Sequence, residues 1–160
     1  MSKNSKRFFI LFTSIMLLSA IVFTACGGGP KEANVQEVYD KLIATNNFQA
    51  MVKVPEREMQ DVFGINTEKL KQHVFYMSEN SAVNADEIAI FEVSDAAYAE
   101  ELENICKKRV ERQREVASSY APEELSKLKP VEVRRVGNYV YYVIGNNYDS
   151  LAKILKDNIG

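Results

Sequence analysis

Hydrophobic positions follow two different periods along the chain, and these periods separate helices from strands. Apolar residues recur at helical spacing from Val35 to Leu42, directly behind Asn34, a residue type that caps helices. Two short runs rich in β-branched and aromatic residues, HVFYM at 73–77 and EIAIFEV at 87–93, predict strands instead. The pattern therefore mixes helices with strands, as in an α+β protein.

Three more helices follow from the same periodicity and from residues that start or end helices. Pro55 suits the first position of a second helix, and Gly64 suits its end. The longest helical pattern, Ala96–Ser119, begins after Asp95, which is a favourable cap. A final helix is expected after a cap at Asp149.

A hairpin is predicted between VEVRRV at 131–136 and YVYYVIG at 139–145, because Gly137 and Asn138 tolerate the positive φ of a tight turn. The predicted order is helix, helix, strand, strand, helix, strand, strand, helix. We expect one small α+β domain over residues 34–160, with a mostly antiparallel sheet of about four strands and helices packed on one face.

The beginning of the chain has the three zones of a secretion signal. Three positive residues precede an uncharged apolar run, Phe8–Ala25, whose last residues are small and stand just before Cys26. This pattern predicts a signal peptide over residues 1–25, with the rest of the chain outside the cytoplasm. The alternative is an uncleaved signal anchor, since the run is about long enough to span a bilayer, and the topology is the same.

The segment Phe23, Thr24, Ala25, Cys26 resembles the bacterial lipobox, although Phe23 stands where Leu is usual. That resemblance implies a diacylglyceryl group on the Cys26 thiol and cleavage just before it. Residues 26–33 then form the lipidated cysteine and a flexible glycine-containing linker. We therefore expect a lipoprotein anchored at the outer face of the cytoplasmic membrane.

Charge and cysteine content exclude several classes of partner. The chain has 20 Lys and Arg against 22 Asp and Glu, and removal of the signal leaves 17 against 22. Because this balance gives no basic field, no nucleic-acid partner is expected, and anionic lipid should repel the domain mildly. The two cysteines lack the spacing of zinc ligands, so no metal and no cofactor are expected.

The residues that catalysis would need are few. His73 is the only histidine, and its place at the start of a strand is typical of a partly exposed bystander. Cys106 lies on the apolar side of the long helix, where a cysteine is usually a small core residue; a disulfide with Cys26 is the less favoured alternative. We predict that the protein is not an enzyme, unless His73 lies in a cleft beside a serine and a carboxylate.

Tyrosine and basic residues supply the candidate binding surface. Alternation along the last strand places Tyr139 and Tyr141 on one face, which is exposed as an aromatic platform if helices cover the other face. Cross-strand packing is the alternative for the tyrosines, and a solvated helix face is the alternative for the basic residues. The candidate binding residues are Tyr139, Tyr141, Lys108, Arg112, Arg134 and Arg135.

Four segments, together with the lipobox, resemble an uncharacterised lipoprotein family, a domain of unknown function found mostly in anaerobic Gram-positive bacteria. They are VFGI at 62–65, DEIAIFEV at 86–93, YAPEE at 120–124 and VGNYVYYVI at 136–144. The resemblance implies a location and an architecture, and it brings no substrate or catalytic residue to this chain.

Two functional hypotheses follow for the mature domain. The first is a noncatalytic surface module that binds a protein, a peptide or a cell-wall component. The second is a small-ligand receptor or an accessory subunit of a membrane complex. A pocket lined by Tyr and Arg would favour the receptor, whereas a flat exposed tyrosine surface would favour the interaction module.

Overall fold

The structure is a computed structural model that describes residues 31–160. Its centre is one sheet with the strand order β1-β2-β3-β5-β4, in which every neighbouring pair is antiparallel. The predicted class, a single α+β domain built on an antiparallel sheet, is confirmed. The predicted signal peptide and Cys26 lie outside the described residues. The strands are β1 (Met51–Lys53), β2 (Leu70–Ser78), β3 (Glu87–Val93), β4 (Arg134–Val136) and β5 (Tyr139–Ile144).

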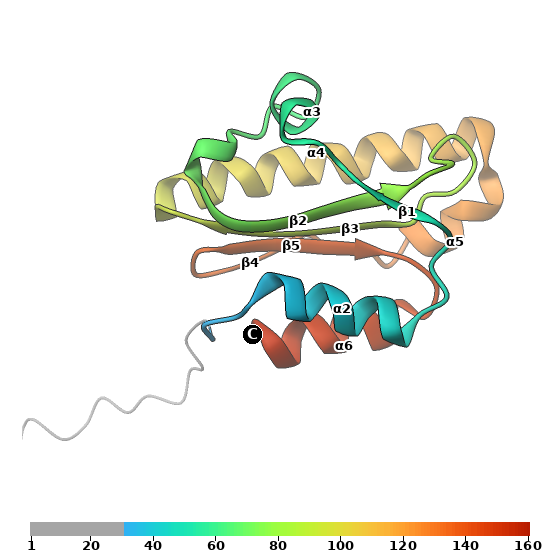
Figure 1. Cartoon of the computed structure of the whole chain (residues 1–160). Helices are drawn as coiled ribbons and strands as arrows, with labels where there is room; N and C mark the ends of the chain where they lie inside the picture. The colour runs from blue at the N-terminus through green and yellow to red at the C-terminus, as the bar shows by residue number, and fades with distance from the viewer. Residues whose placement is uncertain (1–30) are drawn as a thin grey trace, which may run out of the picture.

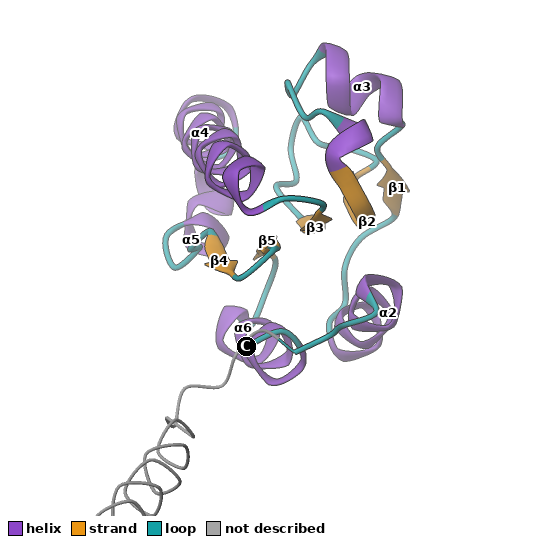
Figure 2. Cartoon of the chain, turned by 90° about the vertical axis from the view of Figure 1, so that its left-hand side faces the viewer, coloured by secondary structure: helices purple, strands orange, loops and turns teal. Residues whose placement is uncertain are grey.

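Helices cover both faces of this sheet. In Figures 1 and 2, α4 and α3 lie on one side of the strands and α2 and α6 lie on the other. The expectation that helices pack on one face only is therefore wrong, because β5 and nearly all of β3 are buried on both sides. The helices are α2 (Val35–Thr45), α3 (Glu56–Asp61), α4 (Ala96–Tyr120), α5 (Leu125–Leu128) and α6 (Tyr148–Asn158).

Local side-chain chemistry starts two of these helices as predicted. The Asn34 side chain accepts hydrogen bonds from the backbone N–H groups of the second and third residues of α2, and Asp95 does the same for α4. The last helix begins at Tyr148, two residues earlier than a cap at Asp149 would allow, because Asn147 takes the left-handed conformation with φ 54° just before it. Pro55 precedes α3 as its cap and is not its first residue.

The hairpin between β4 and β5 forms at the predicted place. Gly137 has φ 58°, and a residue with a side chain rarely adopts that backbone conformation. The sheet nevertheless has five strands where about four were expected, because the sequence pattern did not predict β1. This strand is only three residues long, so its sequence is too short to show an alternating pattern.

Two hydrophobic cores lie on opposite faces of the sheet. One packs α4 against it and includes Phe75, Phe91, Leu102, Tyr142 and Ile144. The other packs α2 and α6 against it and includes Leu42, Val74, Ile90, Tyr139, Tyr141 and Leu151. Every buried residue of these two cores falls between positions 33 and 159. The segment 31–160 thus carries all the described contacts that hold the helices on the sheet.

The second core encloses the two tyrosines that were expected to be exposed. Tyr139 is 4% exposed and Tyr141 is 3% exposed. The Tyr139 hydroxyl accepts a hydrogen bond from the Ala33 backbone N–H, and the Tyr141 hydroxyl donates to the Gly160 carbonyl oxygen. The exposed aromatic platform is therefore wrong, because α2 and α6 cover that face as well.

The start of the described chain is fixed to the far end of α6. The Lys31 backbone N–H donates to the carbonyl oxygen of Ile159 at 3.2 Å, and its Nζ donates to that of Asp157 at 2.6 Å. Figure 1 shows the first helix, in blue, beside the red C-terminal helix. Within residues 31–160, none of the helices has the length and apolar character needed to cross a bilayer.

Candidate functional site

Two hollows open beside α6, and the Tyr148 side chain lines both. The first, here called the polar hollow, has a volume of about 460 Å³ and includes Ser126, Lys127, Gly145, Asn146, Tyr148 and Ser150 in its lining. The second, here called the basic groove, has a volume of about 220 Å³ and includes Glu132, Arg134, Tyr141, Val143, Tyr148 and Lys156. Together they form the candidate binding site.

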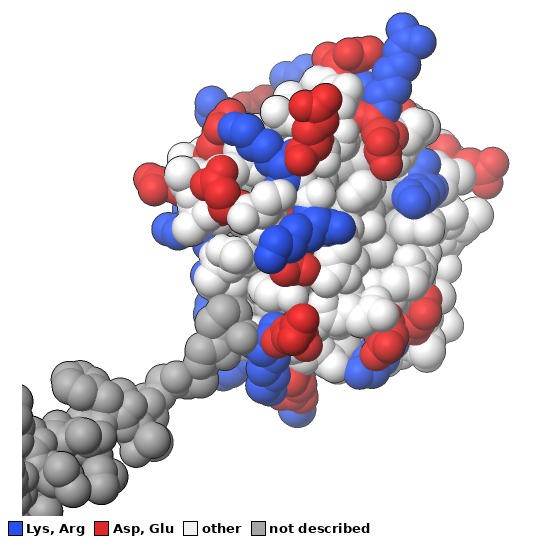
Figure 3. All heavy atoms as spheres, turned by 60° about the vertical axis from the view of Figure 1, so that its left-hand side comes forward, with Lys and Arg blue, Asp and Glu red and all other residues white. Residues whose placement is uncertain are grey.

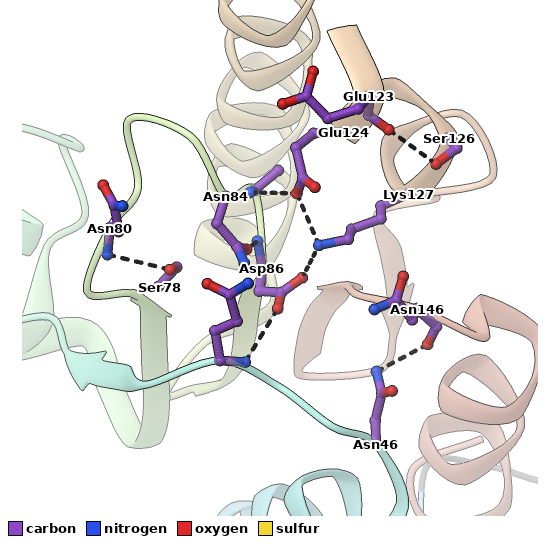
Figure 4. Close-up of polar contacts among 12 residues, drawn as sticks. Asn46, Ser78, Asn80, Asn84, Asp86, Glu123, Glu124, Ser126, Lys127 and Asn146 are labelled. Atoms are coloured by element: carbon purple, nitrogen blue, oxygen red, sulfur yellow. Dashed lines mark hydrogen bonds and ion pairs between the residues drawn. The ribbon is translucent and has the colours of Figure 1, made fainter. Parts of the chain in front are cut away.

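The polar hollow lies where β5 ends and the chain turns into α6. Gly145 makes this turn in a crowded place, because a Cβ built on it would lie 2.7 Å from the Phe48 ring and 2.9 Å from the Asn46 amide nitrogen. The Asn46 side chain also donates to the Asn146 carbonyl oxygen at 2.8 Å (Figure 4). The end of α2 and the start of α6 are thereby held together at one wall of the site.

Lys127 also lines the polar hollow, and its ammonium group lies between two carboxylates (Figure 4). Its Nζ is 2.9 Å from Asp86 Oδ1 and 2.8 Å from Glu124 Oε2. Burial alone would lower the pKa of Lys127, but its hydrogen bonds to Glu124 and Asp86 outweigh that effect and raise it. Lys127 is thus charged at neutral pH and already neutralised by two carboxylates, so it joins α5 to the segment before β3 and has little charge left for a ligand.

The basic groove has cations on both walls and an apolar floor. Arg134 comes from β4 and Lys156 from α6, while Val143 and Leu155 form part of the lining and are themselves buried. Arg134 Nη1 is 3.1 Å from Glu132 Oε2, but these two side chains are 57% and 66% exposed. Within residues 31–160, Lys156 forms no ion pair. Both cations are therefore available to a ligand.

Two tyrosine hydroxyls stand in the same groove. Tyr148 Oη accepts a hydrogen bond from the Glu132 backbone N–H at 3.0 Å. Burial raises the pKa of Tyr148 and of Tyr141, and the nearby Arg134 opposes that rise. Both phenols consequently remain protonated at neutral pH. The Tyr141 hydroxyl already donates to the Gly160 carbonyl oxygen, so Tyr148 is the phenol that can donate to a ligand.

Of the six residues predicted for binding, the fold brings only Tyr141 and Arg134 together in a hollow. Tyr141 is mostly enclosed, yet it contributes to the groove that Arg134 flanks. Tyr139, two residues earlier on the same strand face, lies under α2 and lines neither hollow. Tyr141 and Arg134 are therefore the two candidate residues that share a hollow.

The other three predicted residues lie elsewhere. Arg135 Nε is 2.7 Å from Glu103 Oε2 and thus belongs to the contact between β4 and α4. Lys108 and Arg112 are exposed on α4, across the sheet from α6, and Arg112 pairs with Glu115 at 3.3 Å. On the face drawn in Figure 3, positive and negative side chains are intermixed. Lys108, Arg112 and Arg135 therefore do not line the basic groove.

Sequence reasoning missed most of the residues that line the hollows. Tyr148 and Lys156 occur at helical spacing on the last helix, but their place beside β4 depends on how the helix docks. Glu132 precedes β4, and Lys127 belongs to a helix of only four residues. The local signal that was present is the polar run Asn146–Asn147 directly after an apolar strand, which is typical of a turn at a sheet end.

The two residues weighed for catalysis line neither hollow. Cys106 is buried in the core under α4, as predicted, and burial raises the pKa of its thiol. His73 lies within β2 opposite Phe91 and is half-buried. The prediction that it is a partly exposed residue of a strand agrees with this position. Burial lowers the pKa of His73, and its buried Nε2 has no hydrogen-bond partner among the described residues.

Comparisons with known proteins give one match. The profile of a family described as a domain of unknown function (DUF4358) matches residues 44–145, from the end of α2 to just beyond β5. This range is more than half of the chain and contains the β4 and β5 side of the basic groove. No curated protein matches the chain, and no solved structure matches it.

Proposed function

This chain belongs to the DUF4358 family, and on that premise we propose that it is a noncatalytic binding domain held by lipid at the outer face of the cytoplasmic membrane. The single observation that carries binding is the basic groove, where Arg134 and Lys156 flank an apolar floor beside Tyr141 and Tyr148. A groove lined by Tyr and Arg favours a small-ligand receptor over a module with a flat tyrosine surface.

The proposed lipid anchor rests on the sequence pattern that ends at Cys26. Five residue steps separate Cys26 from Lys31, and an extended chain covers at most about 3.6 Å per step. The end of the domain around Lys31 and Ile159 would then lie within about 18 Å of the lipid surface. The polar hollow lies at the opposite end of α6 from this attachment point.

Anchoring is tested by replacing the cysteine in the full chain. Cys26→Ser, expressed in a Gram-positive host, is expected to lose labelling by a palmitate analogue and to lose cleavage of the signal peptide, so that the larger precursor accumulates. Cys106→Ser serves as the control and should keep both properties. Palmitate labelling of the Cys26→Ser variant would contradict the lipoprotein proposal. An unmutated protein that carries no label and keeps the size of the precursor would favour the uncleaved anchor.

Binding is tested by a thermal-shift screen of segment 31–160 against wall fragments, sugars, peptides and amino-acid derivatives. A ligand at about one hundred times its dissociation constant should stabilise the fold by about 2.7 kcal/mol. The shift should fall in Arg134→Ala and persist in Arg57→Ala, because Arg57 is a 91% exposed side chain of α3, across the sheet from the groove. A shift that survives Arg134→Ala would place the binding site elsewhere.

The edge of the sheet supports a second candidate, a protein partner. Within residues 31–160, β4 pairs only with β5, so no described strand lies beside its outer backbone groups. An unpaired edge with exposed Arg134 and Arg135 can accept an extended segment of another protein. An empty ligand screen combined with cross-linking of a β4 cysteine variant to a membrane protein would favour this accessory role.

A further inference from the structure

We propose that the ligand of the basic groove is a carboxylate attached to a small apolar group, of the size of one amino-acid residue. This inference rests on the proposed binding function and adds the chemical class of the ligand.

The side chains that face the groove are rich in donors. Arg134 and Lys156 carry only donors, and Tyr148 keeps its O–H free because its oxygen accepts the Glu132 backbone N–H. Among the lining side chains, Glu132 is the one carboxylate. A ligand that satisfies three donors at once must present acceptors, and a carboxylate presents two strong ones.

The ion pair already in the groove is easily exchanged. Arg134 and Glu132 contact each other at 3.1 Å, yet both side chains are more than half exposed. Exposed pairs of this kind contribute little, because solvent screens them and two long side chains must be ordered. A ligand carboxylate can therefore take over Arg134 and at the same time neutralise Lys156.

The charged side chains that line the groove favour a ligand with a single negative charge. Among the side chains that line the groove, two cations and one carboxylate leave one positive charge uncompensated. By contrast, Lys127 in the polar hollow is neutralised by two carboxylates of its own. The basic groove is thus the hollow that complements a monoanion.

The floor and the volume define the rest of the ligand. Val143, Ala152 and Leu155 provide an apolar surface beneath the cations. The volume of about 220 Å³ is below the range of about 300–1,000 Å³ typical of drug-sized ligands. One aliphatic side chain next to its carboxylate fits this space, and the terminal residue of a peptide has that chemistry.

The test uses segment 31–160 and two probes of nearly the same shape, N-acetyl-leucine and N-acetyl-leucine amide, in which a neutral amide replaces the carboxylate. Titration followed by ¹H–¹⁵N NMR should move the amide signals of β4, β5 and α6, and the carboxylate should bind at least about tenfold more tightly than the amide. Raising the salt concentration should weaken binding of the carboxylate and leave the amide unchanged.

Point variants test whether N-acetyl-leucine binds in the basic groove. Arg134→Ala and Lys156→Ala should each weaken binding of N-acetyl-leucine about tenfold. Lys153→Ala is the matched control, because this exposed lysine of α6 pairs with Asp157 and lines neither hollow. The same affinity in all four proteins would overturn the assignment to the groove.

The two proposals fail in different ways. Equal binding of the acid and the amide at the groove overturns the carboxylate and leaves the binding function standing. Absence of binding by both probes overturns this ligand class, whereas the ligand screen with Arg134→Ala continues to test the binding function by itself.

Discussion

Arg109 of α4 donates to both carboxylate oxygens of Glu87 on β3, with Nη2 2.6 Å from Oε2 and Nε 3.1 Å from Oε1. Glu87 is fully buried, and it also accepts hydrogen bonds from Gln113 and from the Tyr142 hydroxyl. Burial would lower the pKa of Arg109, but Glu87 raises it and keeps the guanidinium charged. This pair therefore joins the long helix to the centre of the sheet by charge as well as by packing.

Removal of Arg109 is expected to be strongly destabilising. Arg109→Ala leaves the Glu87 carboxylate buried without its cation, which costs about 3–5 kcal/mol in the free energy of unfolding. Urea denaturation of segment 31–160 measures this change. Arg112→Ala is the control, because that side chain is 71% exposed and should change stability by less than about 0.5 kcal/mol. A similar small loss for both variants would show that Glu87 does not depend on Arg109.

His73 is expected to make stability fall in mildly acidic solution. Burial, and then Lys53, lower the pKa of His73 in the folded state below the ordinary 6.5, while Glu56 opposes them. The unfolded chain thus takes up the proton at a higher pH, so protonation favours unfolding as the pH falls from about 7 towards the folded-state pKa. His73→Gln should remove this decline between about pH 7 and pH 5, above the range where carboxylates titrate. Equal pH profiles of the two proteins would contradict the shift.

Cys106 is expected to be chemically inert in the folded protein. Its thiol is buried, and burial raises its pKa, with Glu87 and Glu103 adding to the effect. Iodoacetamide should therefore label native segment 31–160 at least about a hundredfold more slowly than the same segment in denaturant, since labelling requires opening of the core. The segment contains no other cysteine, so the measured label reports on this thiol alone. Rapid native labelling would be inconsistent with the packing under α4.

Gly145 is expected to tolerate no side chain. Gly145→Ala places a methyl group 2.7 Å from the Phe48 ring and 3.1 Å from Leu151, and overpacking of this kind costs about 1–3 kcal/mol. Thermal unfolding of segment 31–160 checks the loss. Asn146→Ala is the neighbouring control, because that residue is exposed and its bond to Asn46 uses the backbone oxygen. An alanine at 145 without cost would mean that α2 moves freely at this point.

Local features of the sequence predicted the elements whose cause is local. Asn34 and Asp95 cap their helices through hydrogen bonds that span three residues at most, and Gly137 permits its turn by itself. Such interactions depend on neighbours along the chain and are visible in the sequence. The alternation of Tyr141 and Tyr142 between the two faces of β5 was predictable for the same reason.

Contacts between distant segments decided the rest. Tyr139 and Tyr141 are buried because α2 and α6, more than 100 residues apart in the sequence, pack together on one face. Glu87 stands in a strand as an ordinary polar residue, and only the docking of α4 encloses it with Arg109. The basic groove exists because β4 and α6 lie side by side. The sequence alone determined the class of fold and most of its helices and strands, since these follow from local periodicity and capping. The tertiary structure decided which residues share a hollow, because that depends on the packing of segments far apart along the chain.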